Sequence, residues 1–171
     1  MTKFIWRPKS KALARQNTNQ ATLNDWSGLV NALVERSKLL DPVDVFTVQF
    51  LESKFSSPFG DNLSLMIGRT QGLFHENDSD VEYFLHAVGA PLESEGKTQA
   101  ELSWDSIGFS KFDSKGKVSF AVGPLGLNDL VSNLHAALSV FELFYGVGPL
   151  TIIQAVGDPK LERMLAEFLP C

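Results

Sequence analysis

Apolar residues recur along this chain with two different periods, and each period predicts a different element. Steps of three and four residues predict helices, because an α-helix turns once every ~3.6 residues. Alternation of apolar and polar residues predicts strands, because successive side chains of a strand point to opposite faces. The helical pattern occurs from a cap at Thr22 or Asn24 to Asp41-Pro42, from Asn128 to Gly146, and from Asp158-Pro159 through Phe168.

The alternating pattern predicts short strands between these helices. Residues 43–51 would also suit one helix face, but their β-branched and aromatic side chains favour a strand. Residues 89–103 contain Gly89, Pro91 and Gly96 and are predicted to form a long loop. The strand-like segments are 43–51, 63–68, 73–75, 81–85, 107–111, 118–122 and 150–153, with a hairpin turn at 113–116.

This order of elements predicts an α+β fold, with a mainly antiparallel β-meander sheet packed against N-terminal and C-terminal helices. The chain has 171 residues, of which 44% are hydrophobic, and this composition suits one packed domain. We assign that domain to residues 21–171 and treat residues 1–20 as a separate basic segment.

Charge is divided unevenly between these two parts. Residues 1–20 contain five basic side chains and no acidic one, so the remaining ten basic and twenty acidic side chains give residues 21–171 a net charge of −10. A surface of that sign repels nucleic acid and attracts basic protein surfaces. The sequence therefore favours a basic protein partner over nucleic acid or a membrane.

The basic segment at residues 1–20 has three interpretations. A transit peptide would need an amphipathic helix, which Trp6-Arg7-Pro8 interrupts. A nucleic-acid-binding arm would be opposed by the acidic residues behind it. We favour the third interpretation, an edge strand or tail held to the core by Phe4, Ile5 and Trp6.

The sequence lacks the residue motifs that are typical of most catalytic and metal-binding sites. Cys171 is the only cysteine, which excludes an intrachain disulfide and a thiolate zinc cluster. The histidines, His75, His86 and His135, lack metal-ligand spacing, and no nucleophile elbow or phosphate-binding loop occurs. We expect a protein that is not an enzyme and has no cofactor or metal. The single cysteine and the absence of a signal-like or membrane-spanning apolar run predict a cytoplasmic location.

Acidic side chains near turns are the best candidates for contact with a basic partner. Carboxylates of this kind raise association rates, whereas buried aromatic anchors supply most of the affinity. Of the aromatic residues beside turns (Phe59, Phe74, Tyr83, Trp104 and Phe112), we select Tyr83 and Trp104 as anchors. The predicted partner-binding set is Glu76, Asp78, Asp80, Glu82, Tyr83, Glu93, Glu95, Glu101, Trp104 and Asp105, from a turn at 76–82 and a loop at 93–105.

The order of motifs between Asp41 and Gln154 resembles the immunity proteins that bacteria produce with polymorphic or contact-dependent toxins. The motifs are Asp-Pro-x-Asp-x-Phe-x-Val at 41–48, Leu-x-Leu-x-Ile-Gly at 63–68 and, after a long helix, Gly-x-Gly-Pro at 146–149. This resemblance implies a non-enzymatic, cytosolic inhibitor that occludes a cognate toxin, often a nuclease or deaminase. The acidic composition suits a basic target of that kind.

Two other classes of function are compatible with the sequence. A small-ligand-binding or enzymatic α+β domain would use a pocket between sheet and helix, with His86 or His135 as the acid–base group. An assembly adaptor would act through its basic N-terminal segment. The oligomeric state is left open by the sequence.

Overall fold

The computed structural model describes residues 3–6, 9–10, 24–50, 63–70, 81–88, 96–114, 117–145, 147 and 151–168. A seven-stranded sheet has the order β1-β9-β4-β5-β6-β8-β7, and every neighbouring pair is antiparallel. The strands are β1 (Lys3–Trp6), β4 (Val45–Phe50), β5 (Leu63–Arg69), β6 (Tyr83–Val88), β7 (Ser110–Ser114), β8 (Lys117–Leu125) and β9 (Thr151–Ala155). A separate two-stranded sheet pairs β2 (Lys9–Ser10) with β3 (Asn24–Asp25).

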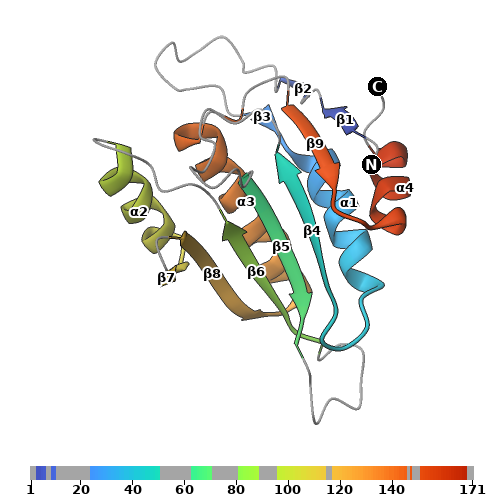
Figure 1. The fold of residues 1–171 in the computed structure, drawn as a ribbon, viewed down its shortest axis with the longest axis horizontal. Coiled ribbons are helices and arrows are strands. Elements are labelled where there is room, and N and C mark those ends of the chain that lie inside the picture. Colours follow the sequence, from blue (N-terminus) through green and yellow to red (C-terminus); the bar gives the residue numbers. More distant parts are fainter. Residues whose placement is uncertain are drawn as a thin grey trace.

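Four helices accompany the sheet in the part of the chain that is described: α1 (Ser27–Lys38), α2 (Gly96–Ser106), α3 (Leu127–Phe144) and α4 (Pro159–Phe168). Helices α1 and α3 lie behind the sheet in Figure 1, α4 packs beside α1, and α2 lies at the β7 end. The predicted α+β class is confirmed, as are the central meander of β4, β5 and β6 and the hairpin of β7 and β8. Strand β1 forms the edge beside β9, as expected for residues 4–6.

The alternating pattern of the strands determines which face of the sheet the helices cover. Phe46, Ile67 and Leu85 lie opposite one another in adjacent strands and are fully or almost fully buried. The same face continues through β8 with Phe120 and through β9 with Ile153. Burying the apolar side of each strand against α1 and α3 removes it from water, which is the main favourable term in folding.

Three details of the helices differ from the sequence prediction. Helix α1 begins at Ser27 rather than after Thr22 or Asn24, because Asn24 pairs with Ser10 in the small sheet. Helix α3 has Gly126 rather than Asn128 at its N-cap position. Residues 96–106 form α2 where we expected a loop, because helical spacing brings Ala100 and Trp104 together into the core.

Val43 has an unusual backbone conformation at the turn before β4. Its φ angle is 64°, its side chain is 65% exposed, and its N–H donates to the Arg69 carbonyl at 3.1 Å. A β-branched residue is strained in this region, whereas asparagine tolerates it. We expect Val43→Asn to raise the free energy of unfolding by about 1 kcal/mol, measured by urea denaturation. The matched Val45→Asn substitution, at a half-exposed position within β4, should give no gain; an equal gain there would contradict the strain explanation.

None of the helices in the described part of the chain has the length and apolar composition needed to cross a membrane.

Candidate functional site

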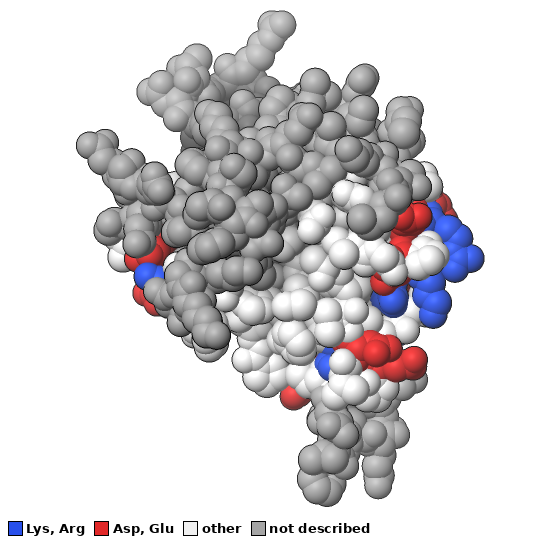
Figure 2. Space-filling model, in the orientation of Figure 1, with Lys and Arg blue, Asp and Glu red and all other residues white. Residues whose placement is uncertain are grey.

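The face of the sheet opposite α1 and α3 carries no helix among the described elements (Figure 1). We call this surface the outer face. Where described residues reach the surface in this view, most of it is uncharged, and acidic and basic side chains gather at its margins (Figure 2). The strand register places on it Thr47 and Gln49 from β4, Ser64 and Met66 from β5, Phe84 and His86 from β6, Ser119 and Ala121 from β8, and Ser110 and Phe112 from β7.

Phe84 has a fixed position on the outer face because two glycines leave room for it. A Cβ atom at Gly68 would lie 2.2 Å from the Phe84 ring, and one at Gly123 would lie 2.8 Å from the Phe84 Cβ. Both distances are too short for any other residue without a shift of its neighbour. The register of β6 against β8 also shifts between Tyr83 and Leu85. These features set the ring of Phe84 beside the bulged end of β8.

A cavity of about 510 Å³ opens at this end of the outer face. Its volume falls within the range of roughly 300–1,000 Å³ that is usual for ligand pockets. Its walls come from segments that are distant in sequence, with Phe84 from β6, Phe112 from β7, and Ala121 and Pro124 from β8. Phe112 is 55% exposed although it is a large apolar side chain. The cavity therefore combines aromatic walls with open access from solvent.

Glu82 is the charged residue that lines the cavity among the described residues. The main chain at this position is held by Thr70, whose N–H and hydroxyl both donate to the Glu82 carbonyl, at 3.0 and 3.1 Å. The Glu82 carboxylate has no hydrogen bond or ion pair with any described residue. A carboxylate that has no partner among the described residues, at the edge of an apolar cavity, suits recognition of a positive group.

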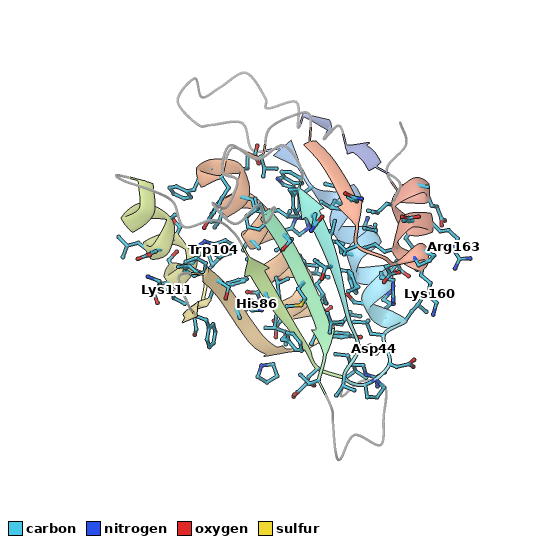
Figure 3. The ribbon with its side chains drawn as sticks, viewed as in Figure 1. Asp44, His86, Trp104, Lys111, Lys160 and Arg163 are labelled. Carbon is cyan, nitrogen blue, oxygen red and sulfur yellow. The ribbon has the colours of Figure 1, made fainter. Side chains whose placement is uncertain are left out.

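His86 lies next to the cavity on β6 (Figure 3). Its ring contacts Phe112 edge to face, with the centroids 6.4 Å apart, and its Nε2 atom is buried without a hydrogen-bond partner in the described structure. Burial lowers the pKa of His86 below its ordinary value of 6.5. The imidazole is therefore neutral at neutral pH. His135, the other acid–base candidate that is described, lies in α3, on the opposite side of the sheet.

Among the described residues, the predicted partner-binding side chains are not brought together at one place. Glu82 lines the cavity, whereas Asp105 is exposed on α2 and Glu101 forms an ion pair of 2.8 Å with Lys111. Glu76, Asp78, Asp80, Glu93 and Glu95 lie outside the described residues, as does His75.

The two expected aromatic anchors are not exposed. Trp104 has no exposed surface and Tyr83 is 5% exposed, because both point toward the helix-covered side of the sheet. Neither side chain offers the exposed surface that an anchor for a partner needs. Among the aromatic side chains that the structure describes, the exposed one is Phe112, a residue beside a turn that was not one of the two predicted anchors. Phe112 and Lys111 are neighbours in a strand, so their side chains point to opposite faces of the sheet. The sequence does not show which of the two faces is the outer one. The pairing of Phe112 with Ser119 in the structure shows that Phe112 lies on the outer face.

In the described part of the chain, no group of three or more His, Cys, Asp and Glu side chains is placed to hold a metal ion. Comparison with family models, curated proteins and solved structures finds no match to this chain.

Proposed function

We propose that this chain is a non-enzymatic inhibitor of a basic protein, and specifically an immunity protein that neutralises a cognate toxin in the cytoplasm. It would bind the toxin through the outer face and occlude the toxin's active site. The resemblance of residues 41–154 to bacterial immunity proteins supports this assignment, and so does the net charge of −10 over residues 21–171.

The observation that carries the proposal is the exposed Phe112 ring at a cavity on a sheet face whose described surface is mostly uncharged. Protein interfaces concentrate their binding energy in a few aromatic residues and pockets, which are surrounded by residues that exclude water. The charged side chains at the margin of the outer face suit the rim of such an interface, where they affect the association rate more than the affinity.

The test begins with capture of a partner by the tagged full-length chain from a lysate of its own organism, washed at low and high salt. The expected result is one stoichiometric basic protein whose capture weakens as salt rises. That protein should also lose its own activity when it is mixed with this chain at equimolar concentration. A captured protein with undiminished activity would contradict inhibition.

Substitutions then locate the interface. Phe112→Ala should weaken binding of the captured protein by about 2 kcal/mol, or roughly 30-fold. Leu143→Ala is the matched control, because Leu143 lies on α3 and is 54% exposed, almost the same as Phe112. Charge reversal at Glu76, Asp78, Asp80, Glu82, Glu93 and Glu95 should slow association at low salt. Equal losses at Phe112 and Leu143, or an unchanged association rate, would argue against this interface.

The volume of the cavity favours a second candidate function, binding of a small ligand. The expected pocket lay between sheet and helix, whereas this cavity opens on the outer face. His86, the acid–base candidate of the sequence that lies on the outer face, would then act beside the ligand through its contact with Phe112, together with the Glu82 carboxylate on the cavity wall. Failure to capture any protein partner would favour this alternative.

A further inference from the structure

We propose that the outer-face cavity binds an arginine side chain of the partner, with the guanidinium group against the rings of Phe84 and Phe112 and beside the Glu82 carboxylate. This inference rests on the proposed function and names the contact that gives it specificity. Three described features carry it: the chemistry of the cavity walls, the Glu82 carboxylate without a partner among the described residues, and the fixed positions of the Phe84 ring and of the main chain at Glu82.

The walls of the cavity suit a flat cation. Phe84 and Phe112 present aromatic rings, whose faces carry partial negative charge and attract cations. Ala121 and Pro124 are uncharged and complete an apolar surface for the methylene groups of a long side chain. Among the described residues, no Lys or Arg side chain lines the cavity, so a positive group from outside meets no repulsion there.

Glu82 supplies the charge that selects a cation over an apolar group. A carboxylate partly removed from water gains most from a charged hydrogen-bond donor, and the donors of arginine match its two oxygens. Arginine fits better than lysine because its planar guanidinium stacks on an aromatic ring and is more weakly hydrated than an ammonium group. A basic partner, expected from the acidic charge of this chain, would present such side chains on its surface.

The Phe84 ring and the main chain at Glu82 are in place before the ligand arrives. The two bonds from Thr70 fix the main chain at Glu82, while the close approach of Gly68 and Gly123 fixes Phe84. Residues that are already in place lose less conformational entropy on binding. The cavity can therefore hold one side chain tightly enough to act as an anchor point for a larger interface.

The test uses two small probes with the full-length chain. Nα-acetyl-arginine methylamide carries the proposed cation, and Nα-acetyl-citrulline methylamide has nearly the same shape without the charge. Titrations followed by ¹H–¹⁵N NMR should shift the amide signals of Phe84, Phe112 and Gly123 with the arginine probe. The citrulline probe should bind about tenfold more weakly, because it lacks the charged hydrogen bonds.

Substitutions separate the cavity from general attraction to an acidic protein. Glu82→Gln should weaken the arginine probe about tenfold and make its affinity equal to that of citrulline. Glu167→Gln removes the same charge from an exposed position on α4, at the other end of the sheet, and should leave the cavity shifts unchanged. Gly68→Ala, which displaces the Phe84 ring, should also weaken the arginine probe.

The outcomes distinguish this inference from the proposed function. If the probe leaves the cavity amides unshifted up to its solubility limit, or if arginine and citrulline bind equally, the arginine assignment is overturned. If Glu82→Gln captures the protein partner as well as the wild type does, the cavity does not take part in the interface. The arginine assignment is then overturned, and the inhibitor function still stands. Failure to capture any partner, with cavity shifts from the arginine probe alone, would overturn the inhibitor function and retain the cation site.

Discussion

Trp104→Ala is expected to lower the free energy of unfolding by about 3–5 kcal/mol. The indole is fully buried and stacks on Phe120, with the ring centroids 5.2 Å apart. The centroid of its ring also lies 4.9 Å from that of Phe109 and 5.8 Å from that of Phe141. Its Nε1–H donates a hydrogen bond of 3.2 Å to the Tyr145 hydroxyl. Removing it opens a cavity where α2, α3 and β8 meet, and close-packed neighbours fill such a space only in part.

Urea denaturation followed by circular dichroism measures this loss. Leu102→Ala is the matched control in the same helix, because Leu102 is 63% exposed and its removal leaves no internal cavity. We expect the control to change stability by less than about 0.5 kcal/mol. A loss of under 1 kcal/mol for Trp104→Ala, within the same two-state transition, would be incompatible with a fully buried anchor of α2.

Trp104 also illustrates which parts of the fold the sequence could predict. Strands β5 and β6 were predicted because apolar and polar residues alternate along each of them, and β4 was predicted because its residues are β-branched and aromatic. Helix α2 was missed because Gly96 and several polar residues are typical of a loop. Its helical signal is the spacing of Ala100 and Trp104, and burial against α3 and β7 outweighs the weak local preference.

The candidate site was predicted only in part for a similar reason. Glu82 was selected for its charge, which composition reveals directly, and it lines the cavity. Phe112 and Trp104 are both aromatic residues close to turns, so the sequence alone cannot distinguish an exposed ring from a buried one. The register of β7 against β8 makes that distinction, and it depends on contacts between paired strands rather than on local sequence.

Asp158→Ala is expected to destabilise the protein by about 3 kcal/mol because this carboxylate has two structural roles. It forms an ion pair with Arg36 of α1, with an Nη2 to Oδ2 distance of 2.9 Å, and the two side chains are only 11% and 12% exposed. It also accepts a hydrogen bond of 2.8 Å from the Leu161 N–H, as the N-cap of α4. Alanine would remove the cap and leave the Arg36 charge, which lies over the Phe46 ring, without its partner.

The pH dependence of stability isolates the charge of Asp158 from its capping role. Burial works to raise the pKa of Asp158, but the hydrogen bonds from Arg36 and the main chain outweigh it, so the pKa lies below its ordinary value of 3.8. The unfolded chain therefore takes up this proton at higher pH than the native state, and the contribution of the ion pair is complete above pH ~4 and is lost as pH falls through the native pKa.

Asp158→Asn, which keeps a capping side chain, is the variant to compare with the wild type over this range. The stability difference between wild type and Asp158→Asn, measured by urea denaturation, should be constant from neutral pH to about 5 and shrink as the pH falls below about 4. Burial also lowers the pKa of His86, but His86 is present in both proteins, so its titration cancels in the difference. A difference that does not depend on pH would mean that Asp158 acts through capping and packing alone, and that α1 and α4 are not held together by its charge.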